Sequence, residues 1–509
     1  MTESFSTRLN DAMALRELKQ IDFVHAAEKF NIKLGKSHMS QYVSGKTVPR
    51  ADIAHFLAAY LRVNEDWLMG KDVPMEEHAA ILPDFAGEQP DHVDDASEQP
   101  TEGRTMRTFT KSHKLDNVLY DVRGPVADEA ARMEAAGTHI LKLNIGNPAP
   151  FGFRTPDEVS TTCRSSCPTR KLFAVEGPVL RAQSHHAVCA AEEHPNVSID
   201  DIYTGNGVSE LINLSLSALL DNGDEVLVPS PDYPLWTACV NLAGGTAVHY
   251  VCDEDSEWYP DIDDMRSKIT DKTKAIVIIN PNNPTGALYP KEVLQQIVDL
   301  AREHQLMIFS DEIYDRLVMD GLEHISIASL APDLFCVTFS GLSKSHMIAG
   351  WRVGWMVLSG NKRLAKDYIE GLNMLANMRM CSNVPAQSVV QTALGGHQSV
   401  KDYLVPGGRI YDQRELVYNM LNDIPGITAV KPKAAFYIFP KIDVKKFNIH
   451  SDEQFALDLL HDKHILISHG GAFNWQEPDH FRVVYLPRIS MLKETIGEIG
   501  DFFSTYWQA

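Results

Sequence analysis

The sequence predicts an α/β protein with a mainly parallel β-sheet, preceded by a small all-helical unit. Four short runs rich in β-branched and aromatic residues alternate with helix-length segments between positions 225 and 341: EVLVPSP, KAIVIINP, LMIFSDE and FCVTFSG. This alternation is typical of parallel sheets with helical crossovers. Three of the runs end in a polar motif, and ligands of such sheets bind at the carboxyl ends of the strands. We therefore expect the functional site there.

Length and composition fit a globular protein of two or three domains, since the chain has 509 residues, 44% of them hydrophobic and 23% charged. We expect no membrane span, because no run of about 18 apolar residues occurs. The N-terminus also lacks the apolar core of a signal peptide. The seven cysteines are scattered without metal-ligand spacing, which predicts no metal site and a reducing, cytoplasmic location.

An acidic segment divides the chain. Residues 76–103 contain nine acidic residues and no Lys or Arg, and Pro and Gly interrupt any periodicity. This composition predicts a disordered linker, which we place at 76–110. The expected organisation is a helical unit at 1–75, the linker, and an α/β unit at 111–509.

The helical unit shows apolar residues at helical spacing, as at Phe23, Ala26, Ala27 and Phe30. Residues 8–70, including SQYVSGKTVPR and VNEDWLMG, resemble the lambda-repressor-like helix-turn-helix domains. The resemblance implies that the polar third helix faces the major groove of DNA.

The side chains expected to contact DNA are Ser37, Ser40, Gln41, Ser44 and Lys46, because Ser and Gln read base edges or hold phosphates and Lys adds positive charge. The formal net charge of −21 excludes nonspecific nucleic-acid binding by the whole surface, so any DNA contact is local. The alternative is a helical interaction or dimerisation module that does not bind DNA.

In the α/β unit, the segment FSGLSKSHMIAGWRVGW places Lys344 in a small-residue loop after a strand, with Arg352 eight residues later. A lysine forms a Schiff base with an aldehyde, and the planar guanidinium of an arginine suits a phosphate. A single lysine on a loop is usually a solvated charge. The pair at this spacing favours a site for a phosphate-bearing aldehyde over a solvated charge.

The segment FSDEIYDRL closes a hydrophobic strand with Asp311 and places Tyr314 three residues later. On a following turn of helix both side chains would face one pocket. Pyridoxal phosphate needs a carboxylate at its pyridine nitrogen and gains from a phenol near its ring hydroxyl. By itself, Asp311 would be better explained as the cap of a helix.

Three further motifs follow strands or precede helices. In NPNNPTGALY, Gly286 permits a tight turn, and the Asn283–Pro284 bond can be cis because Pro lowers the cost of that form. Together these features would direct the side-chain amide of Asn283 toward a cofactor. In TGNGVSEL, the N–H groups at the start of a helix form an anion site for a phosphate. That site comprises Gly207, Val208 and Ser209. In SPDYPLW, Tyr233 is either an aromatic that stacks on the cofactor ring or a core residue.

In this order and spacing, the motifs of residues 111–509 resemble the fold-type I, class I aminotransferases, which use pyridoxal 5'-phosphate. The segments KLNIGNPAPFGF, CDEDSEWYPDIDD, VIINPNNPTG and GLSKSHMIAGWRVGWMVLSG are most similar to the glutamate–pyruvate (alanine) aminotransferases. The resemblance implies a large cofactor domain at about 155–400 and a small α+β domain formed by 111–154 and 401–509.

The resemblance also implies roles for individual residues. Lys344 binds the cofactor aldehyde and moves the α-proton of the substrate. Cofactor contacts are implied for Asp311 at the pyridine nitrogen, Tyr314 and Asn283 at the ring oxygen, Tyr233 over the ring, and Arg352 with Gly207, Val208 and Ser209 at the phosphate. Gly341 stands where many relatives carry a phosphate-binding Ser, a role that we assign to Ser343. Substrate-carboxylate contacts are implied for Gly146, Asn283 and Arg482, with Arg488 as the alternative arginine.

The implied reaction transfers the amino group of L-alanine to 2-oxoglutarate, giving pyruvate and L-glutamate. Partners are therefore small amino acids and 2-keto acids, and the family implies a homodimer whose sites lie at the subunit interface. Two alternatives remain. One is a transcription regulator whose aminotransferase-like domain senses an amino acid or cofactor without turnover, and the other is a pseudogene product.

Residues 163–193, CRSSCPTRKLFAVEGPVLRAQSHHAVCAAEE, do not fit the resemblance. Relatives carry here a segment like Tyr-x-x-Ser-Lys-Gly-Leu-Tyr-Ser-Ala-Arg-Lys-Ala-Ile, whose first Tyr reaches the phosphate of the partner subunit's cofactor. Codons for Gly-Leu-Tyr-Ser-Ala-Arg-Lys-Ala-Ile, read from their third base, encode Pro-Val-Leu-Arg-Ala-Gln-Ser-His, which is the sequence of residues 178–185. We therefore interpret residues 160–191 as the product of two compensating frameshifts that impair activity, against the simpler explanation of a diverged loop.

Overall fold

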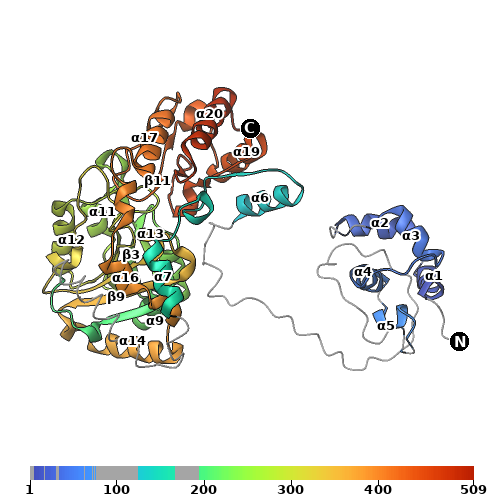
Figure 1. The fold of residues 1–509 in the computed structure, drawn as a ribbon, viewed down its shortest axis with the longest axis horizontal. Coiled ribbons are helices and arrows are strands. Elements are labelled where there is room, and N and C mark those ends of the chain that lie inside the picture. Colours follow the sequence, from blue (N-terminus) through green and yellow to red (C-terminus); the bar gives the residue numbers. More distant parts are fainter. Residues whose placement is uncertain are drawn as a thin grey trace. The chain divides into compact units, whose positions relative to one another are not determined.

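The chain forms two compact units, Met1–Arg107 and Thr108–Ala509 (Figure 1). The computed structural model describes residues 5–16, 18–29, 32, 34–61, 63–71, 73, 75, 124–166 and 194–509. The linker predicted at 76–110 and most of the unusual segment at 160–191 lie outside these residues.

In the described part of the first unit, five helices surround one core. They are α1 (Phe5–Leu15), α2 (Gln20–Lys29), α3 (Lys36–Val43), α4 (Ala51–Leu61) and α5 (Glu65–Leu68). Each helix contributes a fully buried apolar side chain: Leu9, Phe23, Met39, Leu57 and Leu68. Arg8 joins the first helix to the last, because its Nη1 donates to the carbonyl oxygens of Trp67 and Lys71 at 2.6 and 2.7 Å.

The second unit is built on a mixed, mainly parallel sheet, as predicted. Its described strands run in the order β2, β9, β8, β7, β6, β3, β4, β5, and β2, β9 and β5 pair antiparallel with their neighbours. The bounds are β2 (Ile202–Asn206), β3 (Glu225–Ser230), β4 (Thr246–Asp253), β5 (Tyr259–Pro260), β6 (Thr273–Ile279), β7 (Met307–Asp311), β8 (Phe335–Gly341) and β9 (Val353–Gly360). The four runs identified in the sequence are β3, β6, β7 and β8.

Helices cover both faces of this sheet. The helices α9 (Val208–Leu219), α10 (Leu235–Leu242) and α14 (Lys366–Arg379) pack on one face, and α11 (Ile262–Lys268) and α12 (Lys291–Glu303) on the other. Strand β6 shows why, since alternate residues of a strand point to opposite faces. Ala275, Val277 and Ile279 join the first layer, whereas Ile276 and Ile278 join the second. A strand buried on both sides reads as a continuous apolar run.

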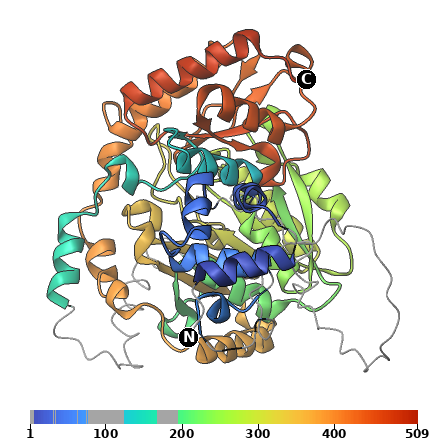
Figure 2. The ribbon, with the colours of Figure 1, turned by 90° about the vertical axis from the view of Figure 1, so that its right-hand side faces the viewer.

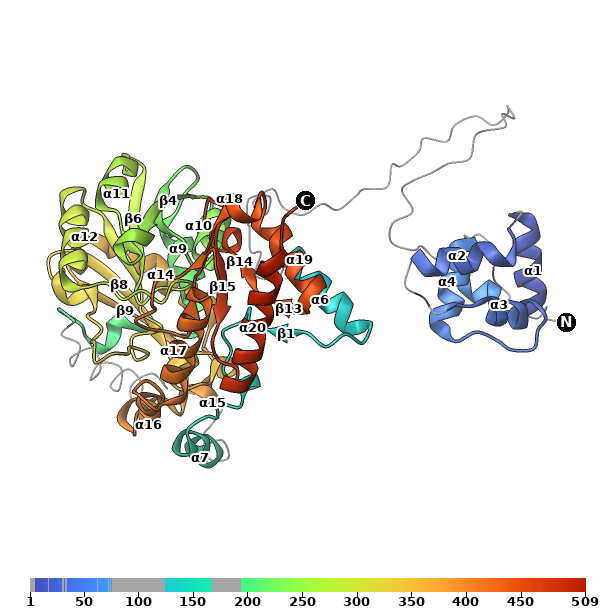
Figure 3. The same ribbon diagram turned by 90° about the horizontal axis from the view of Figure 1, so that it is seen from above.

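A smaller domain combines segments from both ends of the second unit around one core. Its helices are α6 (Pro125–Ala135), α17 (Arg409–Asn422), α18 (Val444–Phe447), α19 (Asp452–Lys463) and α20 (Ile489–Thr505). Its short strands are β1 (Leu141–Lys142), β10 (Ile427–Thr428), β11 (Tyr437–Ile438), β12 (Lys441–Ile442), β13 (Ile465–Leu466), β14 (Ser468–His469) and β15 (Phe481–Val484). Figure 3 shows α17, α19 and α20 gathered around β14 and β15.

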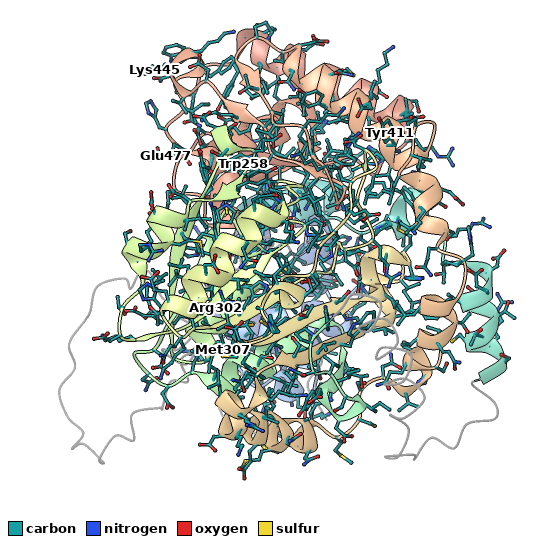
Figure 4. All side chains as sticks on the ribbon, turned by 90° about the vertical axis from the view of Figure 1, so that its left-hand side faces the viewer. Trp258, Arg302, Met307, Tyr411, Lys445 and Glu477 are labelled. Atoms are coloured by element: carbon teal, nitrogen blue, oxygen red, sulfur yellow. The ribbon has the colours of Figure 1, made fainter. Side chains whose placement is uncertain are left out.

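Within the second unit, α14 and α20 lie at opposite ends (Figures 1 and 2). The remaining short helices are α7 (Asp157–Ser166), α13 (Leu342–Ser345), α15 (Val384–Gln387) and α16 (Val390–Gly395). Trp258, labelled in Figure 4, is buried, and its ring packs against Phe439, Trp475 and His480, which joins the layer containing α12 to the small domain. Among the described residues, no helix is both long and apolar enough to span a bilayer.

Candidate active site

A cavity of about 260 Å³ opens where the carboxyl ends of β6, β7 and β8 meet the start of α9 and the small domain. This volume is near the lower end for small-molecule sites. The lining includes these residues predicted from the sequence: Gly146, Val208, Ser209, Tyr233, Asn283, Asp311, Tyr314, Ser343, Lys344, Arg352 and Arg482. Residues far apart in the chain therefore converge on one cavity.

Lys344 lies in α13, immediately after β8, and projects into this cavity. Its Nζ donates to the carbonyl oxygen of Gly146 at 2.8 Å. The same nitrogen lies 5.9 Å from the ring centre of Tyr314 and 5.7 Å from that of Phe436. The amine thus lies near two aromatic rings just beyond the carboxyl end of β8, where it could react as a nucleophile with a bound aldehyde.

Asp311 ends β7 and lines the cavity, with only 3% of its surface exposed. Its Oδ2 accepts from Trp236 Nε1 at 3.1 Å, and its Oδ1 accepts from the backbone N–H of Ile313 at 3.3 Å. Burial raises the pKa of the Asp311 carboxyl to about 6, against the lowering effects of these hydrogen bonds and of the Lys344 charge. A cation beside this carboxylate would favour its ionised form.

Tyr314 follows Asp311 in a hydrogen-bonded turn, whereas the sequence suggested a turn of helix. Both side chains nevertheless line the same cavity, as expected. The hydroxyl groups of Tyr314 and Tyr437 are 2.8 Å apart. Burial, with Tyr437 beside it, holds the pKa of Tyr314 well above its usual value, so this phenol stays protonated and able to donate a hydrogen bond.

Arg482 lies in β15 with 4% of its surface exposed. Its Nη1 donates to Asn283 Oδ1 at 2.8 Å, and its Nη2 donates to the carbonyl oxygen of Asn144. The Asn283–Pro284 bond is cis. Arg488, the alternative considered from the sequence, is exposed just before α20 and is not among the described lining residues of the cavity. Of the two candidate arginines, Arg482 is therefore the one found among the described lining residues of the cavity.

Gly207 immediately precedes α9 with a φ of 83° and, unlike Val208 and Ser209, is not among the described lining residues of the cavity. A Cβ atom at Gly207 would lie 2.2 Å from Arg352 Nη2, so the guanidinium occupies the space that a side chain would fill. Arg352 Nη1 donates to Ala349 O at 2.9 Å. The arginine and the first N–H groups of α9 thus form a positively charged cradle for an anion.

Gly341, where the family resemblance implies a serine, lies in a crowded part of the backbone. It pairs with Gly354 across β8 and β9, and a Cβ atom at Gly341 would lie 2.7 Å from the carbonyl oxygen of Val353. This backbone has no room for a serine there. Ser343 is buried and lines the cavity two residues later.

In the first unit, the predicted DNA-contacting residues lie on and just after α3. Ser40, Ser44 and Lys46 are exposed, and Gln41 is half-buried. Ser37 lies in the first turn of the helix.

The sequence did not point to Trp236, Asn144 or Tyr437. Trp236 donates to Asp311, Asn144 accepts from Arg482, and Tyr437 contacts both Tyr314 and Arg482. Each reads in the sequence as an ordinary core or loop residue. The one available signal was the pair of aromatic residues in AAFYIFP, which is equally typical of a buried strand.

Comparisons with known proteins agree with this geometry. A family model described as aminotransferase class I and II matches residues 139–498. The glutamate–pyruvate aminotransferase AlaA of Haemophilus influenzae is 55% identical over 410 residues, covering 79% of this chain and all of that protein. An alanine aminotransferase of Mycobacterium tuberculosis is 53% identical over 407 residues, covering 79% of this chain and 94% of that protein.

Solved structures give the same picture. An aminotransferase from Escherichia coli matches with a TM-score of 0.78 at 54% identity, covering 79% of this chain and 100% of that one. An alanine aminotransferase from Pyrococcus furiosus matches with a TM-score of 0.74 at 38% identity, covering 78% of this chain and 100% of that one.

Proposed function

The chain belongs to the class I and II aminotransferases, and from this premise we propose that it is an alanine aminotransferase that transfers the amino group of L-alanine to 2-oxoglutarate with pyridoxal 5'-phosphate. The named relatives that support this substrate pair are glutamate–pyruvate and alanine aminotransferases. The observation that carries the proposal is one cavity that contains a lysine, a buried carboxylate and a buried arginine.

The residues present fit pyridoxal 5'-phosphate. When bound, this cofactor supplies an aldehyde and an electron-withdrawing ring that acidifies the α-carbon of the amino acid. Asp311 would face the pyridine nitrogen, and a protonated ring nitrogen would remove the cost of ionising a buried carboxyl. Arg352 and the N-terminus of α9 would hold the phosphate, because the absence of a side chain at Gly207 lets the guanidinium lie against the start of this helix.

Further contacts would fix the cofactor ring and the amino acid. Tyr233 would stack on the ring, and Tyr314 and Asn283 would donate to its oxygen. Arg482 would clamp the substrate carboxylate, because its guanidinium is already fixed by Asn283 Oδ1 at 2.8 Å. Gly146 would border the same carboxylate.

Lys344 would then move the proton. An amino acid held by Arg482 and the cofactor would have its α-carbon near Lys344 Nζ, which donates to the carbonyl oxygen of Gly146 at 2.8 Å. As a free, neutral amine, Lys344 Nζ would be a base that accepts the α-proton and delivers it to the aldehyde carbon of the cofactor. A second keto acid takes the same route in reverse.

The active form is proposed to be a cytoplasmic homodimer. Apolar side chains are exposed at the end of the second unit that carries α14: Leu364 (70%), Met374 (61%), Met378 (79%) and Met380 (75%). A cluster of exposed methionines is typical of a protein interface. Light scattering would show twice the chain mass, and replacing Met374 and Met378 with lysine would give monomers.

The proposed activity is tested by measuring pyruvate formed from L-alanine. We expect sustained pyruvate formation, beyond a single turnover of the bound cofactor, only when 2-oxoglutarate is also present, and no pyruvate from the Lys344→Ala variant. If wild-type protein formed no more pyruvate than this variant, the alternative of a regulator with a non-catalytic sensing domain would be favoured.

We further propose that the first unit binds DNA through α3 and the turn that follows it, because Ser40, Ser44 and Lys46 are exposed there. Fluorescence anisotropy with random-sequence duplexes, followed by selection of bound sequences, tests this. We expect binding that weakens with salt, and weakens further in a Gln41→Ala, Lys46→Ala double variant. Equal affinity of wild type and double variant would indicate an interaction module instead. An affinity that changes with L-alanine would show that the two units communicate.

A further inference from the structure

Tyr437 has no assigned part in this site, yet it lies between two groups that do. It begins β11, has 2% of its surface exposed and lines the cavity. Its backbone is fixed on two sides. Strand β11 pairs antiparallel with β15 next to Arg482, and the turn at Gly286 packs so closely that a Cβ atom there would lie 3.0 Å from the Tyr437 carbonyl oxygen.

The hydroxyl group of Tyr437 contacts the phenol proposed to bind the cofactor. It is 2.8 Å from the Tyr314 hydroxyl, and the two rings meet edge to face with centres 5.7 Å apart. When Tyr437 donates to the oxygen of Tyr314, the proton of Tyr314 is left to point into the cavity. Hydrogen bonds in such a chain polarise one another, so Tyr314 becomes a stronger donor.

The ring of Tyr437 contacts the arginine proposed to bind substrate. The Arg482 Cζ lies 4.6 Å from the centre of the ring, on the scale of a cation–π contact. The hydroxyl end of the Tyr437 side chain packs against Gly146, where a Cβ atom would lie 2.0 Å from the hydroxyl oxygen. The absence of a side chain at Gly146 therefore lets Tyr437 reach Tyr314.

We propose that Tyr437 is a positioning residue for both the cofactor and the substrate. Its hydroxyl group orients Tyr314 toward the cofactor ring oxygen, and its ring orients Arg482 toward the substrate carboxylate. The inference rests on the proposed function for the identity of the ligands. It goes further by separating two effects of one side chain. The first effect acts on the cofactor and the second on substrate affinity.

The two effects separate in two substitutions. Tyr437→Phe removes the hydroxyl group and keeps the ring, whereas Tyr437→Leu removes both. Tyr485→Phe is a matched control, because Tyr485 is also buried in the small domain and its hydroxyl donates to Ala435 O at 3.2 Å, but it is not among the described lining residues.

The cofactor effect is read from the visible absorption of the bound cofactor as a function of pH. A hydrogen bond donated to the ring oxygen stabilises the form with fewer protons, so weakening it raises the pH of the transition. For Tyr314→Phe, which removes this hydrogen bond, we expect an upward shift of about 0.4 to 1 pH unit, and for Tyr437→Phe, which weakens it, a smaller upward shift. Tyr485→Phe leaves the transition unchanged.

The substrate effect is read from the KM for L-alanine. We expect Tyr437→Phe to change it less than about twofold, and Tyr437→Leu to raise it by about 2- to 30-fold, the range of a cation–π contact. The proposal is overturned if Tyr437→Phe leaves the pH transition where it is in wild type. It is also overturned if both variants raise KM equally. If the protein bound cofactor without turning over alanine, the proposed function would fail, while the pH shift would still decide the role of the hydroxyl group.

Discussion

Replacing Asp311 with asparagine is expected to stabilise the cofactor-free protein at neutral pH while abolishing tight cofactor binding. Burial raises the pKa of this carboxyl from 3.8 to about 6. A carboxyl whose pKa is higher in the folded than in the unfolded state favours folding most when protonated. Its contribution is therefore present below about pH 4 and is lost as the pH rises toward about 6.

The size of the effect follows from the shift. About 2 pKa units at 1.36 kcal/mol each amount to about 3 kcal/mol over the full range, and about half of this falls between about pH 5 and about pH 8. Asparagine resembles the protonated carboxyl and does not titrate. The free energy of unfolding of Asp311→Asn, minus that of wild type, is thus expected to become more positive as the pH rises.

The assay is urea unfolding of cofactor-free wild type and variant at the two pH values, followed by cofactor titration at the higher one. The titration of other groups is common to both proteins and cancels in the difference. A difference that stays constant with pH would refute the burial argument. A variant that binds cofactor as tightly as wild type would refute the placement of Asp311 at the ring nitrogen.

Three further substitutions test other parts of the site. Gly207→Ala places a methyl group against Arg352 and is expected to weaken cofactor binding, measured by titration, whereas Gly223→Ala, with a similar positive φ and open space around it, is not. Equal losses would indicate backbone strain alone. Gly341→Ser, which restores the residue of many relatives, is expected to lower the urea midpoint because a backbone carbonyl blocks its Cβ; tighter cofactor binding without this loss would contradict the steric argument. Arg482→Lys is expected to lower kcat/KM for alanine about 10- to 150-fold, the loss of one charge-assisted hydrogen bond, with cofactor absorption unchanged.

Much of the fold was predictable from the sequence because its signals are local. The strands β3, β6, β7 and β8 are short apolar runs, and their polar ends mark the site, because parallel strands bring their carboxyl ends to one edge. Lys344 and Asp311 were found in this way, each directly after a strand. The turn at Tyr314 was mistaken for a helix because the residue spacing alone does not distinguish the two.

Other features depend on contacts between distant segments, which no local pattern records. Tyr437 reaches Tyr314 over a separation of 123 residues, and Trp236 reaches Asp311 over 75. The need for a glycine at position 341 becomes visible only in the structure, because it arises from the neighbouring strand β9. The interpretation of residues 160–191 as frameshifted stays a prediction, since residues 167–193 lie outside the described part. The gene, read one base over in that interval, would encode the segment of the relatives if the interpretation is right.

The most direct test of the proposed function is the absorption spectrum of the purified protein with pyridoxal 5'-phosphate, before and after L-alanine is added. We expect a visible band that depends on Lys344, and we expect alanine alone to replace it with near-ultraviolet absorption as the amino group passes to the cofactor. A band that alanine leaves unchanged would contradict the assignment of this chain as a working aminotransferase.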